Sequence, residues 1–215
     1  MTHQNDVSGA PRDRYTRVAI VLHWAIAALI VFNLCIGSFM KTFTPMALML
    51  HSSSGLTVLA LTVARVVWRL LNDPPPYPEG MRPWERHTAH FAHFLLYAAM
   101  VLMPLAGWAI VSAHSPPGSP GAVVEWATPR GPPPPLKIWN LVPLPMIAPI
   151  QAIGEEPSGL APQRVLHDEF VEWHHVGAYL LLGLLILHIG GALKHQFIDK
   201  QSEFARMGIG RRRQS

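Results

Sequence analysis

The chain has 215 residues and a formal net charge of +4; half of its residues are hydrophobic and only 14% carry a charge. The apolar residues gather in long runs, which the core of a soluble protein does not require and which are typical of membrane-spanning helices. The basic residues lie in the flanks of these runs, so the positive charge indicates membrane orientation, and we expect no nucleic-acid partner.

Four apolar runs are long enough to cross a bilayer, which takes about 20 helical residues. We therefore predict an all-α fold, an integral membrane four-helix bundle in which residues 1–215 form one domain. The first run is too long for the apolar region of a signal peptide and lacks a clear cleavage site, so we expect it to remain as a span. The predicted spans cover about residues 17–40, 51–71, 88–113 and 170–195.

Lys and Arg residues predict the orientation of these spans, because cytoplasmic loops carry an excess of both. The excess lies before the first span, between the second and third, and after the fourth, so we expect both termini in the cytoplasm and contacts of the basic tail with membrane lipids. The outer loop, residues 114–169, is long and proline-rich, with apolar residues such as Trp126 and Trp139. It either caps an outer site, docks a partner, or only shields the helix ends.

Two histidines of the fourth run, His174 and His188, are fourteen residues apart. That spacing is just under four helical turns and about 21 Å along the axis, so both side chains leave one face. A histidine inside the bilayer is unfavourable and marks a functional site by default. This pattern predicts two haems stacked across the membrane, and hence an electron carrier.

Two further histidines share the depths of this pair. His23 lies six residues inside the first run and is level with His188, whereas His51 begins the second run at the outer level of His174. A low-spin b-type haem takes two axial imidazoles on opposite faces of its plane. His23 with His188, and His51 with His174, are therefore the predicted ligand pairs for the haem iron.

Small residues accompany three of these histidines. Gly55, Gly177 and Gly191 lie one turn from His51, His174 and His188 on the same helix faces. A missing side chain there lets a flat macrocycle approach the backbone, although small residues are common wherever membrane helices pack.

Other histidines compete for these roles. Geometry alone lets His93 replace His188 as the inner ligand, and the cluster of His87, His90 and His93 suits haem propionates or lipid headgroups. A zinc site there lacks the cysteine or carboxylate of a familiar spacing. His175 points about 100° from His174, so only one of the two can be a ligand. The remaining histidines, expected to be solvated or interfacial, are His3, His114 and His167.

Several segments together resemble the prokaryotic cytochrome b561 family. They are Arg14-Tyr15-Thr16-Arg17, Leu22-His23-Trp24, His51-Ser52-Ser53-Ser54-Gly55, Ala89-His90-Phe91-Ala92-His93, Glu172-Trp173-His174, Leu187-His188, and Ala192-Leu193-Lys194-His195-Gln196-Phe197-Ile198-Asp199. The resemblance covers all but the N-terminal tail and parts of the outer loop.

That resemblance implies a four-helix bundle in a bacterial inner membrane, holding two haem b groups and linked to a respiratory chain. It places the four axial ligands on His23, His51, His174 and His188. It also places a quinone pocket, with ubiquinone as the expected substrate, beside His195 at the cytoplasmic side. His195 follows His188 by seven residues, about two turns or 10 Å, on nearly the same face.

Two functions are compatible with these features. The first is an oxidoreductase that passes electrons between an outer donor, superoxide in one branch of the family, and membrane quinone. The second is a haem-bearing membrane anchor that carries electrons for a partner such as a hydrogenase or a periplasmic cytochrome. The lone cysteine, Cys35, excludes an intrachain disulfide and covalent haem attachment through a Cys-x-x-Cys-His motif.

Overall fold

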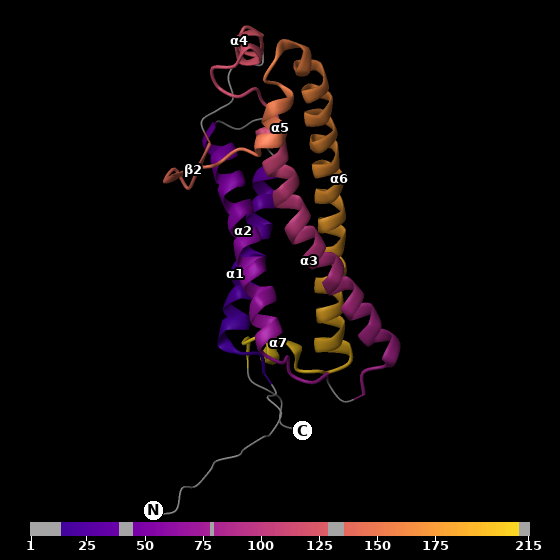
Figure 1. The fold of residues 1–215 in the computed structure, drawn as a ribbon. Coiled ribbons are helices and arrows are strands. Elements are labelled where there is room, and N and C mark those ends of the chain that lie inside the picture. The colour runs from indigo at the N-terminus through magenta and orange to yellow at the C-terminus, as the bar shows by residue number, and fades with distance from the viewer. Residues whose placement is uncertain (1–13, 39–44, 78–79, 129–135, 211–215) are drawn as a thin grey trace, which may run out of the picture.

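Four long helices run side by side in the computed structural model, which describes residues 14–38, 45–77, 80–128 and 136–210 (Figure 1). Each is long and apolar enough to cross a membrane. The helical fold with four apolar spans is therefore confirmed. The helices are α1 (Arg17–Ser38), α2 (Pro45–Leu71), α3 (Pro83–Ser112) and α6 (Leu160–Leu193), the last of which continues into a π-helical turn, η3 (Lys194–Ile198).

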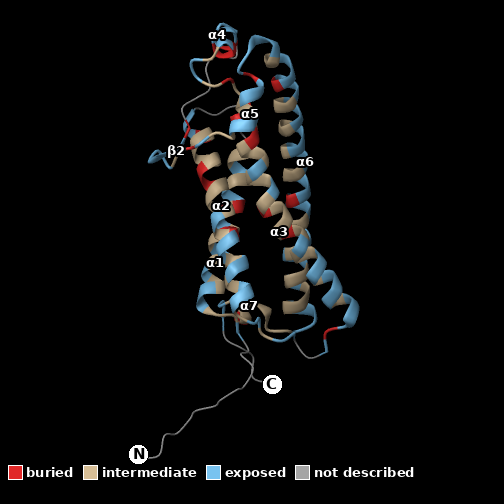
Figure 2. Cartoon of the chain, viewed as in Figure 1, coloured by how far each residue is buried: buried red, intermediate tan, exposed pale blue. Residues whose placement is uncertain are grey.

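The helices pack in chain order, α1 on α2, α2 on α3, and α3 on α6. Apolar side chains from all four meet at mid-height in a small core, and most of the other apolar side chains face outward (Figure 2). Leu70 and Leu187, for example, are 80% and 71% exposed. A surface this apolar is stable against lipid rather than water. The core residues are Ile26, Ile30, Val58, Leu96, Met100 and Leu181.

Two helices begin earlier than their apolar runs. We expected spans from about residues 51 and 170, but α2 starts at Pro45 and α6 at Leu160. Hydropathy marks only the part of a helix that lies in the bilayer, and a proline is well tolerated in the first helical turn. His51 and His174 therefore lie inside their helices rather than at their first turns.

The outer connection contains short elements that pack on the bundle. The β1 and β2 strands form an antiparallel hairpin whose turn includes Trp139. The Trp139 backbone N–H donates to Ser53 Oγ at 2.8 Å and its indole N–H donates to Thr57 Oγ1 at 3.0 Å, which holds the hairpin on α2. The predicted loop also contains Pro132–Pro135, which lie outside the described residues. Its elements are α4 (Pro120–Trp126), β1 (Lys137–Ile138), β2 (Val142–Pro143), α5 (Ala148–Ile153) and η2 (Pro157–Gly159).

The opposite end of the bundle is closed by the short helix α7 (Glu203–Arg206). Trp24 of α1 donates its indole N–H to the Met207 carbonyl at 3.0 Å, and the Tyr15 backbone N–H donates to the Arg206 carbonyl at 3.3 Å. The start of α1 and the end of α7 thus lie together (Figure 1). Their cytoplasmic location stays a prediction.

Candidate functional site

Two pairs of histidines face each other inside the bundle. His51 of α2 and His174 of α6 have ring centroids 6.0 Å apart, and His23 of α1 and His188 of α6 have ring centroids 6.3 Å apart. The structure therefore brings together both pairs that the depth argument selected. We call them the outer pair, His51 and His174, and the inner pair, His23 and His188.

The separation within each pair leaves room for one metal ion. A ring nitrogen lies about 1.1 Å from its centroid and about 2.0–2.1 Å from a bound metal, so imidazoles on opposite sides of one metal have centroids about 6.3 Å apart. Both observed separations agree with this value. The two pairs therefore fit a group that would be held by two histidines, such as the iron of a b-type haem.

His93 of α3 is a third imidazole at the inner level. Its ring centroid lies 5.3 Å from that of His188, closer than the two rings of either pair. This spacing leaves less room for a metal between His93 and His188 than between His23 and His188. Over the described ranges no three His, Cys, Asp or Glu side chains converge as a metal site, so the structure does not gather His87, His90 and His93 into one ligand set.

Two glycines that the sequence argument overlooked lie against the outer pair. A Cβ atom at Gly37 would lie 3.2 Å from Cε1 of His51, and one at Gly107 would lie 3.3 Å from Cε1 of His174. Both distances are tighter than an ordinary contact, so a side chain at either position would push the neighbouring imidazole by a few tenths of an ångström. The sequence spacing could have identified these glycines. Gly37 follows His23, and Gly107 follows His93, by the same fourteen residues that separate His174 from His188.

The three expected glycines differ in their surroundings. A Cβ at Gly191 would meet nothing within 4 Å, whereas one at Gly55 would lie 3.7 Å from the Asn33 amide and one at Gly177 would overlap the Met103 thioether. Gly177 thus leaves the space on α6 that the Met103 side chain of α3 fills. Only Gly191 leaves open space beside its histidine.

Asn33 of α1 orients His51. In the orientation that gives both of its amide atoms a partner, its nitrogen lies 2.8 Å from His51 Nδ1 and 3.0 Å from the His51 carbonyl. When Nδ1 accepts from the amide, the proton of the neutral ring lies on Nε2. A histidine that binds a metal through Nε2 instead donates its Nδ1–H, so haem binding here would require the Asn33 side chain to present its oxygen to Nδ1.

The end of α6 carries a polar cluster around His195. His195 Nδ1 and Lys194 Nζ each lie 2.7 Å from Asp199 Oδ2, and Lys194 Nζ also donates to Glu85 Oε1 at 2.9 Å. The hydrogen bond from Lys194 lowers the pKa of Asp199 below its ordinary value. The π-helical turn that begins at Lys194 widens the helix here, a distortion frequent at functional sites.

The other histidines divide into exposed and paired residues. His175 is exposed on α6 and points away from the outer pair, as expected. His114 was expected to be solvated or interfacial; its side chain is 14% exposed and its Nδ1 lies 3.1 Å from Glu125 Oε1. His167 Nδ1 lies 2.9 Å from Asp168 Oδ1. His3 lies outside the described residues.

A family model decides the classification. The model described as prokaryotic cytochrome b561 matches residues 14–210, which include every histidine of the two pairs and His195. The chain belongs to the prokaryotic cytochrome b561 family. It is therefore a multi-pass membrane protein of electron transport, and the family implies haem b as its cofactor.

Several known proteins resemble this b561-family chain. "Cytochrome b561 homolog 2" of Escherichia coli (strain K12) is 25% identical over 91% of this chain and 91% of its own length. "Probable superoxide oxidase CybB" of Yersinia pestis is 26% identical over 46% of this chain and 58% of its own length. "Cytochrome b562" of Cereibacter sphaeroides is 35% identical over 43% of this chain and 63% of its own length. The match with the first covers most of this b561-family chain, and the matches with the other two cover less than half of it.

Proposed function

We propose that this chain holds two b haems, one at each histidine pair, and passes electrons across the membrane between an outer donor and quinone. The observation that carries the proposal is the presence of two facing imidazole pairs, 6.0 Å and 6.3 Å apart, that share the single helix α6. The fourteen residues between His174 and His188 separate the pairs by about 21 Å along α6.

Each part of the chain has a role in this proposal. A haem held by each pair would supply an iron able to carry one electron. The imidazoles hold the metal, Gly37 and Gly107 let the outer imidazoles take their positions, and the apolar core at mid-height excludes water between the two levels. A dry interior favours electron transfer over side reactions of the reduced protein.

We place the quinone beside His195. Asp199 accepts a hydrogen bond from Nδ1 of His195, which leaves Nε2 for a ligand, and a protonated imidazole would donate from Nε2 to a quinone carbonyl. A protonated imidazole there would pass its Nε2 proton to the reduced quinone. The side chain is 17% exposed, which gives it access to water for resupply of that proton.

We propose superoxide as the outer donor, because one relative, from Yersinia pestis, is described as a probable superoxide oxidase. Two superoxide anions each lose one electron and become O2. The two electrons, with two protons from the opposite side, convert one ubiquinone into ubiquinol. The relative aligns with less than half of this chain, so the donor is the part of the proposal that most needs a direct assay.

The hairpin on the outer surface favours a second candidate, a haem-bearing anchor that receives electrons from a protein partner. Leu141 and Val142 are 81% and 58% exposed there, which suits contact with a protein or with lipid. Reduction of the purified chain by superoxide, followed by reduction of ubiquinone, supports the enzyme. Haem reduction only when a co-purifying protein is present supports the anchor.

Haem content tests the two-haem proposal. We expect two haems per purified chain, with His51→Ala or His174→Ala removing one and His23→Ala or His188→Ala removing the other. His175→Ala is the matched control, because it deletes an exposed imidazole next to the outer ligand and should keep both haems. Fewer than two haems in the unaltered protein refutes the proposal.

Stopped-flow oxidation of the reduced protein by ubiquinone tests the quinone site. His195→Ala should keep both haems and both spectra but slow their oxidation by ubiquinone, since the carbonyl loses its donor. His87→Ala is the control, an exposed imidazole on α3 that has no place in the proposed site. Equal oxidation rates in the two variants remove His195 from the mechanism.

A further inference from the structure

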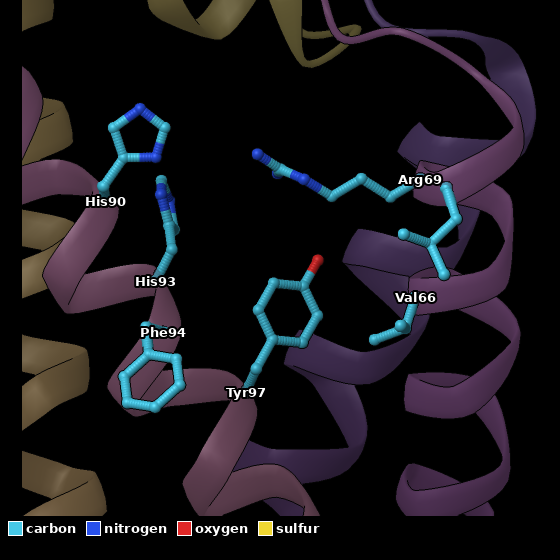
Figure 3. Close-up of a pocket in the computed structure, with 7 residues that line it drawn as sticks. Val66, Arg69, His90, His93, Phe94 and Tyr97 are labelled. Atoms are coloured by element: carbon cyan, nitrogen blue, oxygen red, sulfur yellow. The ribbon is translucent and has the colours of Figure 1, made fainter.

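A cavity of about 310 Å³ lies between α2 and α3, next to the inner pair (Figure 3). The side chain of Arg69 extends from α2 across the cavity toward His90 and His93 of α3, and the Tyr97 hydroxyl points toward the same space (Figure 3). Val66, Leu70 and Phe94 form its apolar wall. The cavity therefore combines an apolar wall with hydrogen-bond donors directed at one region.

Two arginines at this place have no anionic partner among the residues that the structure describes. The ion pairs of the described residues involve neither Arg65 nor Arg69. Arg65 donates only to neutral oxygens, to the Tyr97 hydroxyl at 2.9 Å and to the Ala19 carbonyl at 3.2 Å. Arg69 makes no hydrogen bond in the described part of the chain. Arg65 lies about 9 Å inside the end of α2, where a cation normally pairs with an anion, and Arg69 lies one turn nearer that end. The two unpaired guanidinium groups together indicate an anionic ligand.

The cavity is continuous with the inner histidine level. His93 lines the cavity, and its ring centroid is 5.3 Å from that of His188. Arg65 lies six residues before the end of α2, and His23 lies six residues after the start of α1, so both are about 9 Å inside the same end of the bundle. A ligand held by the inner pair therefore has its edge beside the cavity.

We propose that the cavity binds the propionate carboxylates of the inner haem, with Arg69 and the Tyr97 hydroxyl as direct partners and Arg65 as a neighbouring positive charge. Haem is an apolar disc with two carboxylates at one edge, which matches a cavity with one apolar wall and one cationic side. An arginine guanidinium binds a carboxylate through two parallel hydrogen bonds, which fixes the orientation of the disc. This inference rests on the proposed inner haem.

Redox titration of the two haems in the purified holoprotein tests the proposal. Arg69→Gln removes a positive charge next to the propionates, which should lower the midpoint potential of the inner haem and leave the outer one unchanged. Unit charges about 10 Å apart at an effective dielectric constant near 20 change an equilibrium constant by about tenfold, and this is the expected shift in the reduction equilibrium. Arg69→Lys keeps the positive charge and should therefore keep most of the inner midpoint potential of the unaltered protein.

Arg86→Gln is the matched control, since Arg86 lies over the Tyr77 ring at the same end of the bundle and does not line the cavity. Arg69 is the residue to vary because it makes no hydrogen bond in the described part of the chain. Loss of Arg65 would also remove the hydrogen bonds to the Tyr97 hydroxyl and the Ala19 carbonyl. Equal inner potentials in Arg69→Gln and in the unaltered protein, with two haems bound to each, overturn the proposal and leave the two-haem function intact.

The phosphate of an anionic lipid has the same chemistry as the propionates, so a second measurement separates the two. We expect the haem-free chain to bind haem dimethyl ester, whose carboxylates are blocked, at least tenfold more weakly than haem b at the inner site, and Arg69→Gln to abolish this preference. A lipid site instead predicts equal binding of haem and its ester, and an effect of Arg69→Gln only in phosphatidylglycerol vesicles. Either of these results overturns the proposal.

Discussion

Gly107 offers a sharp test of the outer site, because an added side chain there meets the imidazole of His174 directly. A Cβ at this position would lie 3.3 Å from His174 Cε1, slightly shorter than the 3.4–4 Å of an ordinary contact. Gly107→Ala therefore displaces the ring by only a few tenths of an ångström. Gly107→Val adds two methyl groups that reach about 1.5 Å further, so the overlap grows to roughly 1 Å and overpacking of about 1–3 kcal/mol is expected.

The consequence for haem follows from the tolerance of the metal bond. Ligand distances at metal sites vary by about ±0.2 Å, so the displacement in Gly107→Ala approaches that limit and the one in Gly107→Val exceeds it. We expect Gly107→Ala to retain both haems with an altered outer spectrum. Gly107→Val should lose the outer haem and keep the inner one, since the pairs are about 21 Å apart.

Reduced-minus-oxidised spectra, with haem quantified per chain, measure both outcomes. Gly183→Val is the control, a substitution on α6 whose Cβ would meet nothing within 4 Å, and it should keep two haems. The retained inner haem of Gly107→Val shows that the bundle still folds. Two haems with unchanged spectra in Gly107→Val would refute the outer site as described.

Three other predictions concern the surroundings of the sites. Reporter fusions after Arg82 and at the C-terminus should read cytoplasmic, and a fusion at Gly121 should read outside; a cytoplasmic signal at Gly121 contradicts the placement of the outer pair. The pKa of Asp199 is lowered in the folded protein, so its stabilising contribution is present above the unfolded value of about 3.9 and is lost as the pH falls through the folded one. As the pH is lowered below about 4, the melting temperature of the unaltered protein should therefore decrease more than that of Asp199→Asn. Parallel curves of melting temperature against pH for the two proteins would exclude this ion pair as a source of stability. Trp139→Phe removes the indole donor to Thr57 while keeping an aromatic ring, and should increase proteolysis of the hairpin without loss of haem; unchanged proteolysis would show that this hydrogen bond does not hold the hairpin.

The spans and the histidine pairs were accessible from sequence because both depend on periodicity along one helix. Apolar length predicts a span, and fourteen residues between His174 and His188 predict one face, whatever the helices pack against. Comparing depths then matched His23 and His51 to these two levels, and the structure brings the matched rings together.

The tertiary structure decided what depends on contacts between helices. The early starts of α2 and α6 do not show in hydropathy, since these turns lie beyond the apolar runs. The tight contacts at Gly37 and Gly107 are made with imidazoles on other helices. Arg69 and Tyr97 line one cavity because α2 packs on α3. The partners of a residue across a bundle depend on how each helix is rotated and how far apart the helices lie, and packing sets both. The amino-acid sequence by itself therefore determined the levels of the sites, and the tertiary structure determined which residues surround them.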